Sequence, residues 1–243
     1  MTMSVTNVET RTAEGKVMPP VAEPKAKPKP PPDREVSHDT SGGIYRSFFK
    51  RAIDISAVLL AVPVVLPVIL GLAAVICASG GHPFYIHDRV GQSGKTFRMW
   101  KLRTMVCDAD ARMNDYLASN REAQDEWDRT QKLVHDPRVT RFGQLLRKSS
   151  LDELPQLWNV LKGEMSLVGP RPMMTCQQEL YPGQAYFALR PGITGYWQTS
   201  ERNRTTFEAR AEYDEAYERD MSLRTDIRVL IKTVSVVLRG TGC

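Results

Sequence analysis

The sequence predicts an α+β, mainly helical, monotopic membrane protein, and three observations support this fold class. One long apolar segment is interrupted by two prolines, strand-forming residues surround a glycine-rich loop, and much of the remainder follows helical spacing. We therefore expect a Pro-broken re-entrant N-terminal helix, a small β-hairpin and interfacial amphipathic helices. A chain of 243 residues has room for one ordinary domain with appendages.

Residues 1–43 differ in composition from everything that follows. They hold 7 of the 16 prolines and almost no large apolar side chain, so they cannot bury enough surface to order themselves. We expect residues 1–43 to form a disordered Pro-rich cytoplasmic tail, with a Pro-rich binding motif as the alternative. Residues 44–82 are then the re-entrant membrane helix, and residues 83–243 form a cytoplasmic domain with the candidate catalytic residues.

The apolar segment, residues 55–78, holds 20 hydrophobic residues out of 24 and no charge. As a helix it would be about 36 Å long, which is enough to cross a bilayer core. Pro63 and Pro67 each remove a backbone hydrogen bond in its middle. Basic residues flank both ends, which would keep both ends in the cytoplasm. Re-entry with a break at Pro67 satisfies both observations, while a kinked spanning helix remains the alternative.

The net charge of +5 suits an anionic membrane surface or a phosphate-bearing substrate. Charge alone would also allow nucleic acid as a partner, but no aromatic–basic motif supports it, so we expect none. The four cysteines are far apart, which argues against a disulfide scaffold or a zinc site.

The polar part of the chain divides into a hairpin followed by helices. Residues 84–90 and 96–106 flank a Gly91–Gly94 loop and predict the β-hairpin. Residues 108–133 favour one exposed helix, and residues 139–146 form a basic amphipathic stretch. That stretch would lie either in the membrane interface or on the core of its own domain.

Two more helices are predicted near residues 206–219 and 225–238, after a loop-rich segment at 163–204. The last helix carries an apolar stripe at helical spacing, which is most simply a face packed on the core. The stripe consists of Ile227, Leu230, Ile231, Val234, Val237 and Leu238.

The densest candidate for chemistry lies at residues 147–159. Ser150 and Glu153 match the S-x-x-E pattern of a capping box, and on that interpretation they only begin a helix. Pro155 fits poorly in such a helix, whereas a later start places Asp152 and Glu153 at the helix N-terminus. That position favours anions and would lower the pKa of a carboxylate. Of two adjacent carboxylates, one would then face a substrate while the other holds a hard cation such as Mg²⁺.

Two cations downstream stand in rigid turns. Arg171 lies between Pro170 and Pro172, which suits a guanidinium directed at a phosphate. Arg190 precedes a Pro-Gly turn, and for each element a plain tight turn is the simpler interpretation.

Taken together and in order, these segments resemble the monotopic phosphoglycosyl transferases of the bacterial sugar transferase family. The resemblance extends over about residues 46–242, and its ending is most similar to the short galactosyl-phosphate transferases of rhizobial exopolysaccharide synthesis. The matching segments are Lys50-Arg51 with Asp54, Lys101 to Met105 including Arg103, Ser150 to Leu154, Gly169 to Pro172, and Arg190 to Gly195. The family often has Ser-Pro at the membrane break, where this chain has Leu66-Pro67.

The resemblance implies transfer of a sugar 1-phosphate, galactose or another hexose, from a UDP-sugar to undecaprenyl phosphate. UMP is released, in the first step of exopolysaccharide synthesis at the cytoplasmic face of the bacterial inner membrane. It assigns the nucleophile to Asp152, which forms a covalent phosphosugar, and the Mg²⁺ ligand to Glu153. Phosphate binding is assigned to Lys101, Arg147 and Arg171, with Arg103 and Arg190 as further substrate-binding residues.

Two other functions remain open on the sequence. Asp108 and Asp110 match the D-x-D metal motif of nucleotide-sugar glycosyltransferases, although the preceding segment is too short for a nucleotide-binding α/β unit. A non-catalytic membrane-anchored scaffold would use the tail and the basic surface. The sequence also leaves open a homodimer.

Overall fold

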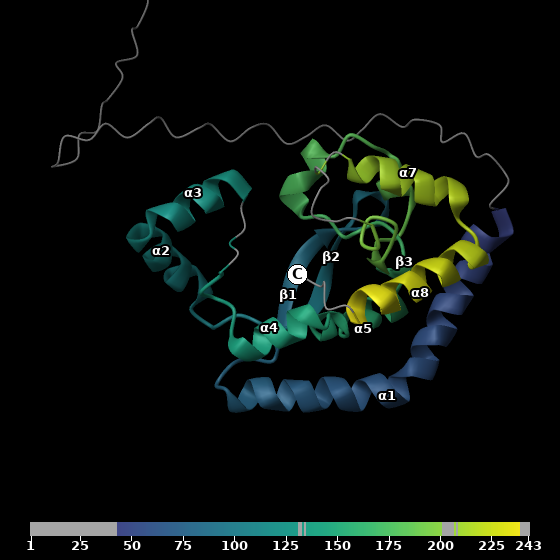
Figure 1. Ribbon diagram of the computed structural model, residues 1–243. Coiled ribbons are helices and arrows are strands. Elements are labelled where there is room, and N and C mark those ends of the chain that lie inside the picture. Colours follow the sequence, from purple (N-terminus) through teal and green to yellow (C-terminus); the bar gives the residue numbers. More distant parts are fainter. Residues whose placement is uncertain (1–42, 131–132, 134, 201–206, 208, 239–243) are drawn as a thin grey trace, which may run out of the picture. The chain divides into compact units, whose positions relative to one another are not determined.

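The computed structural model describes residues 43–130, 133, 135–200, 207 and 209–238 (Figure 1). The expected tail, residues 1–43, therefore lies outside the described residues except for Gly43. The described chain is mainly helical with a small hairpin sheet, as the sequence predicts, and it also has a second small sheet within the segment expected to be loop-rich.

The apolar segment forms one long helix. A π-helical turn, η2 (Tyr45–Phe49), runs directly into α1 (Lys50–Ala78), which contains both Pro63 and Pro67. The chain stays helical through both prolines, and the ribbon of α1 bends part-way along (Figure 1). Among the described residues, this is the one helical stretch long and apolar enough to cross a membrane.

Both halves of α1 pack on the same body of the protein. In its first half, Val58 is buried in a cluster with Phe97, Met99, Val160 and Met165. In its second half, Ala73 and Ile76 are buried in another cluster with Leu102 and Leu146. Val58 and Ile76 are 18 positions apart, which corresponds to about 27 Å along a helix. The helix therefore lies against the rest of the protein over nearly the thickness of a bilayer core.

The other side of α1 is apolar and uncovered. Its exposed large side chains are Leu59, Leu60, Val64, Leu66, Val68, Leu70 and Val75. Apolar side chains of this size are normally buried or in contact with lipid, so the uncovered side of α1 is a surface suited to lipid.

Polar contacts fix the start of α1 to distant segments. Asp54 is buried, and its carboxylate accepts hydrogen bonds from Ser166 Oγ at 2.7 Å and from the backbone N–H of Leu167 at 3.3 Å. The Arg51 guanidinium donates to the carbonyl oxygens of Val160 and Leu161. A buried carboxylate is costly without such donors, so these contacts select one position for the helix.

A second polar cluster joins the same end of α1 to the C-terminal helices. Asp226 accepts from Lys50 Nζ at 2.6 Å, from the Tyr45 hydroxyl at 2.8 Å and from the Tyr217 hydroxyl at 2.7 Å. Three donors on one carboxylate compensate for most of the hydration that it loses on burial.

The predicted hairpin is present. Strands β1 (Phe84–Val90) and β2 (Thr96–Leu102) pair antiparallel, with Tyr85 opposite Lys101, around the 3₁₀ turn η3 (Gln92–Gly94). The second sheet is a short parallel pair, β3 (Ser166–Val168) and β4 (Gly192–Thr194).

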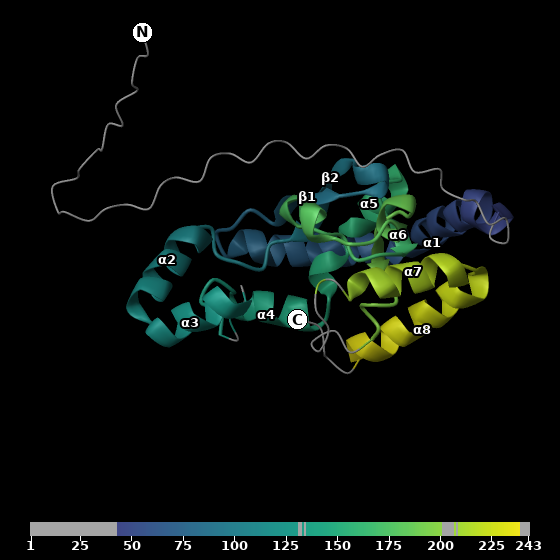
Figure 2. The same ribbon diagram turned by 90° about the horizontal axis from the view of Figure 1, so that it is seen from above.

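The expected single helix over residues 108–133 is in fact two, α2 (Ala109–Ser119) and α3 (Arg121–Thr130), which lie against each other (Figure 2). Asn120 separates them in an extended conformation, and its side-chain oxygen accepts from the N–H of Ala123. Asparagine is a preferred N-cap, so the residue type carries the signal for this break.

The next three elements lead to the candidate site. They are α4 (Arg141–Lys148), the 3₁₀ turn η4 (Leu151–Glu153) and α5 (Gln156–Lys162). In α4, Phe142 and Leu146 pack with α1 and β2 while Leu145 is exposed. The amphipathic stretch therefore packs on the core of its own domain and leaves one leucine outside.

The rest of the chain returns over the sheets through η5 (Thr175–Leu180), α6 (Ala185–Ala188), α7 (Arg210–Asp220) and α8 (Leu223–Leu238). The apolar stripe expected to pack α8 on the core is instead mostly exposed, at Ile227, Leu230, Ile231 and Val234. Helix α8 contacts the protein through the opposite face, with Thr225, Asp226 and Val229 buried.

Candidate functional site

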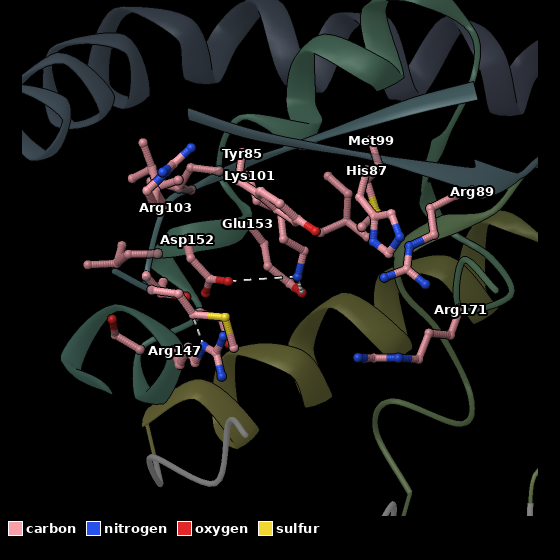
Figure 3. A pocket seen from close by; sticks show the side chains of 18 of the residues that line it. Tyr85, His87, Arg89, Met99, Lys101, Arg103, Arg147, Asp152, Glu153 and Arg171 are labelled. Carbon is pink, nitrogen blue, oxygen red and sulfur yellow. Dashed lines mark hydrogen bonds and ion pairs between the residues drawn. The ribbon is translucent and has the colours of Figure 1, made fainter. Parts of the chain in front are cut away.

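A cavity of about 890 Å³ lies where the hairpin, the α4–η4 junction and the loop after β3 meet (Figure 3). Six of the sequence-predicted site residues line it: Lys101, Arg103, Arg147, Asp152, Glu153 and Arg171. The structure therefore brings together residues spread over some seventy positions of the chain.

The carboxylate pair stands in the 3₁₀ turn, before the α-helix and not at its first turn. Ser150 adopts a left-handed backbone conformation, with φ 56°, and its side chain makes no capping hydrogen bond. The capping-box interpretation is therefore wrong, because Ser150 lacks the extended backbone of an N-cap. Pro155 occupies the N-cap position of α5, where its missing N–H costs nothing.

Lys101 holds the two carboxylates together. Its Nζ lies 2.7 Å from Glu153 Oε1 and 3.7 Å from Asp152 Oδ2 (Figure 3). Asp152 is buried, with 7% of its surface exposed, and Glu153 is less so. One cation thus balances two adjacent negative groups at the wall of the cavity.

Burial raises the pKa of Asp152 above its ordinary value. Lys101 and Arg147 oppose this rise, and the neighbouring charge of Glu153 adds to it. The expectation of a lowered pKa is wrong, because desolvation of the carboxylate outweighs the favourable charges around it. A desolvated carboxylate held ionised by neighbouring cations is a stronger nucleophile than a hydrated one.

Arg147 owes its place to a close helix contact. Thr140 is the N-cap of α4, and its hydroxyl oxygen accepts a hydrogen bond from the N–H of Gly143. Helix α4 lies so close to the segment after β2 that a Cβ on Gly143 would be only 2.0 Å from the carbonyl oxygen of Thr104. Arg147 Nε donates to Thr104 Oγ1 at 2.9 Å. Its charge favours the ionised form of Asp152.

Close backbone contacts between glycines fix the loop that carries Arg171. A Cβ on Gly192 would lie 2.1 Å from Gly169 N, and one on Gly195 would lie 2.1 Å from Gly169 O. The Gly-Pro-Arg-Pro and Pro-Gly-Ile-Thr-Gly segments therefore pack backbone against backbone, which only glycine permits. Figure 3 shows Arg171 reaching into the cavity from the side opposite Asp152.

Arg103 and Arg190 differ in their position. Arg103 lines the cavity, and one of its guanidinium nitrogens lies 3.4 Å from Cys107 Sγ. Arg190 is apart from the cavity lining, since its Nε donates to the carbonyl of Gly163 at 3.1 Å. In this structure Arg190 connects β4 to the end of α5.

Sequence reasoning missed one wall of the cavity. Tyr85, His87 and Arg89 line it from β1, beside Lys101 of β2. Residues at alternate positions of a strand share a face, and Tyr85 pairs with Lys101 across the hairpin. Once Lys101 is chosen as a site residue, the period of two therefore predicts Tyr85, His87 and Arg89 on the same face. Trp197 was also missed as a partner of Arg171, whose guanidinium carbon lies 5.4 Å from the ring centre.

The residues present fit a hydrated cation bound by few protein ligands. Among the described residues there is no group of three or more His, Cys, Asp or Glu that could hold a metal by itself. Mg²⁺ commonly takes one or two carboxylates and completes its shell with water and substrate phosphates. Glu153, which already contacts a cation at Lys101, provides such a carboxylate.

The D-x-D residues have a different setting from the one that motif requires. Asp108 and Asp110 lie at the start of α2, where Asp108 is exposed and Asp110 is half-buried and lines the cavity. Before them, the described chain holds one long helix and a two-stranded antiparallel hairpin, with no alternating α/β unit.

Comparison with known proteins gives a consistent result. The family model described as bacterial sugar transferase matches residues 45–240. A UDP-galactose-lipid carrier transferase of Erwinia amylovora is 44% identical over 197 residues, which are 80% of this chain and 41% of that protein. The undecaprenyl-phosphate galactose phosphotransferase of Salmonella typhimurium is 42% identical over 80% of this chain and 41% of its own length.

A shorter relative matches over most of its length. The exopolysaccharide production protein ExoY of Sinorhizobium fredii is 43% identical over 196 residues, 79% of this chain and 87% of its own. The chain thus spans less than half of the longer relatives and nearly all of the shorter one. The family match covers the long apolar helix α1, the hairpin and every residue of the cavity named above, and the chain belongs to the bacterial sugar transferase family.

Proposed function

We propose that the protein transfers a hexose 1-phosphate, such as galactose 1-phosphate, from a UDP-sugar to undecaprenyl phosphate. One observation carries the proposal: an adjacent, partly desolvated Asp152–Glu153 pair, balanced by Lys101, faces Arg147 and Arg171 across one cavity. Family membership and the names of the relatives, which include a lipid carrier transferase and an undecaprenyl-phosphate galactose phosphotransferase, support the choice of substrates.

In the proposed first step, an Asp152 oxygen attacks the β-phosphorus of the UDP-sugar. The bond from that phosphorus to the bridging oxygen breaks, and UMP leaves with the electron pair. A sugar phosphate then remains bonded to Asp152. In the second step, a phosphate oxygen of undecaprenyl phosphate attacks the same phosphorus, and the Asp152 carboxylate is released.

The surrounding residues have separate parts in this scheme. Lys101 favours the ionised form of Asp152 and, with Arg147 and Arg171, binds phosphate oxygens whose negative charge is redistributed during transfer. Glu153 would hold Mg²⁺, which would neutralise diphosphate charge when bound.

The nucleophile can be tested directly by intact-protein mass spectrometry. After brief exposure to UDP-galactose without acceptor, the wild type should gain the mass of one hexose phosphate, which peptide mapping should locate on Asp152. Asp152→Asn should gain none at any Mg²⁺ concentration. Glu153→Gln should keep the nucleophile, and raised Mg²⁺ should restore part of its labelling rate.

Four results would contradict parts of this assignment. An adduct on Glu153, or one that persists in Asp152→Asn, would refute the role of Asp152. Full activity of both variants would remove the proposed mechanism and favour the scaffold. Release of UDP instead of UMP, measured over a panel of UDP-sugars with undecaprenyl phosphate, would favour a D-x-D-type glycosyl transfer.

We also propose that α1 enters and leaves the membrane on one face, with the tail and the domain both cytoplasmic. The contacts of both halves of α1 with the same body support this topology. Cysteines at Ser41 and Ser93, introduced after the native cysteines have been replaced by serine, should be labelled from the same side. Labelling from opposite sides would restore a spanning helix. Pro67→Ala should increase the spanning population, since it restores a mid-helix hydrogen bond.

A further inference from the structure

Three arginines from separate parts of the chain lie near one another, and two of them line the cavity at its end away from Asp152. Arg89 lies on β1, Arg171 in the loop after β3, and Arg210 at the start of α7. Arg89 and Arg171 line the cavity, where Figure 3 shows both guanidinium groups directed into it. Arg210 lies behind Arg171 and Trp197, in a closed hollow too small to hold a water molecule.

The backbone holds Arg89 beside Arg171. The N–H of Val90 donates to the carbonyl of Met173 at 3.1 Å. The Tyr186 hydroxyl accepts from the N–H of Met173 at 3.2 Å and donates to the carbonyl of Val90. Tyr186 is buried, so these bonds fix the strand and the loop to each other.

Trp197 orders the other two arginines. The guanidinium carbon of Arg210 lies 4.3 Å from its ring centre and that of Arg171 lies 5.4 Å away. A guanidinium stacked on an aromatic ring keeps its N–H edge free for a planar, bidentate acceptor.

The positive charges of the three arginines exceed the negative charge of the acidic side chains near them. Burial and then the charge of Arg171 lower the pKa of Arg89, and the same two causes lower the pKa of Arg210 to about 10. Asp214 is the acid that opposes this effect at Arg210, and it also accepts from the Tyr181 hydroxyl at 2.7 Å. The Nε atoms of Arg89 and Arg210 are buried with no acceptor among the described residues. A dianion bound in the cavity at Arg89 and Arg171 would relieve the repulsion within the cluster.

We propose that Arg89 joins Arg171 in a second phosphate site, with Arg210 as a positioning residue behind Arg171, and that this site binds a phosphate monoester next to the phosphate attacked by Asp152. The inference rests on the proposed function, because that reaction supplies two such groups: the phosphate of the departing UMP and the phosphate of the acceptor lipid. Both have the same chemistry, and the experiment distinguishes them.

The first test is arginine footprinting of the full-length wild type in detergent micelles. Phenylglyoxal modifies accessible guanidinium groups, and peptide mass spectrometry measures the rate at each arginine. Saturating UMP or farnesyl phosphate should slow modification of Arg89 and Arg171, which line the cavity, several-fold, while the exposed Arg219 of α7 serves as the control. Protection by UMP alone would assign the site to the nucleotide, and protection by farnesyl phosphate alone would assign it to the lipid. Modification of both arginines at unchanged rates with either ligand would overturn the proposal.

The second test uses Arg89→Gln and Arg210→Gln, with Arg219→Gln as the matched control. Calorimetric titration should show binding of UMP or farnesyl phosphate weakened about tenfold or more in both variants and unchanged in the control. Variants that fold and bind both ligands as tightly as the wild type would refute the site. If neither variant folds, the arginine footprinting of the wild type alone tests the proposal. Neither test needs turnover, so a wild type that is protected but never releases UMP would refute only the proposed function. An active wild type without protection would refute only the second phosphate site.

Discussion

Gly143→Ala should disturb the candidate site through the position of a helix. Gly143 is the third residue of α4, and a Cβ there would lie 2.0 Å from the carbonyl oxygen and 2.9 Å from the Cα of Thr104. These are backbone atoms, so no side-chain rotation relieves the overlap. Helix α4 must therefore move away from Thr104, to which Arg147 Nε donates at 2.9 Å.

Two opposing effects set the size of the change. Alanine is the better helix former by about 1 kcal/mol, whereas overpacking a tight contact costs about 1–3 kcal/mol. Because the overlap exceeds 1 Å against backbone, the cost should prevail, leaving a net loss of about 1–2 kcal/mol. For a chain of this size, that corresponds to a fall in Tm of roughly 2–8 °C, measured by circular dichroism in detergent micelles.

The matched control is Gly71→Ala, another helical glycine, around which a Cβ would meet nothing within 4 Å. Its Tm should stay equal or rise. Thr104→Val separates the two consequences of the shift, since it removes the acceptor for Arg147 without adding a clash. It should lower the labelling rate of Asp152 with a smaller change in Tm than Gly143→Ala. An unchanged Tm and labelling rate in Gly143→Ala would refute the reasoning.

Two further predictions concern pH. Lys101→Met removes the cation 3.7 Å from Asp152, so the pKa of this carboxylate should rise further. The acid limb of the pH profile for labelling of Asp152 by the UDP-sugar should then move to higher pH. An acid limb that does not move would contradict the role of Lys101. Burial raises the pKa of Asp214 from 3.8 to about 7. Between these pH values Asp214 binds a proton in the folded state but not in the unfolded state, so the free energy of unfolding falls as pH rises from about 4 to about 7. Asp214→Asn still accepts from Tyr181 and should remove this part of the dependence of Tm on pH, and identical profiles for variant and wild type would show that Asp214 does not titrate in this range.

The sequence was sufficient for elements with strong local signals. The apolar run, the glycine-centred hairpin and the final helices all have regular spacing or marked turn residues, and each is present. The grouping of Lys101, Arg147, Asp152 and Arg171 was also predicted, but from the resemblance, because no local pattern connects residues so far apart.

Features set by tertiary contacts were beyond local reasoning. The capping box failed because Ser150 adopts a left-handed conformation in a tight 3₁₀ turn, which the S-x-x-E pattern does not reveal. The pKa of Asp152 was predicted in the wrong direction because helix position was considered without burial. The stripe on α8 was assigned to the core because spacing identifies an apolar face and not what covers it.

The contacts at the start of α1 mean that this long apolar helix is an integral part of the fold and cannot be removed without exposing the core. A truncation beginning after it would leave Ser166 and Asp226 without partners from α1 and would uncover Val160 and Met165. Attempts to obtain a soluble enzyme by deleting the hydrophobic segment should therefore yield aggregated protein. Solubility is better sought by substituting the outward-facing side chains of α1 and leaving its inner face intact.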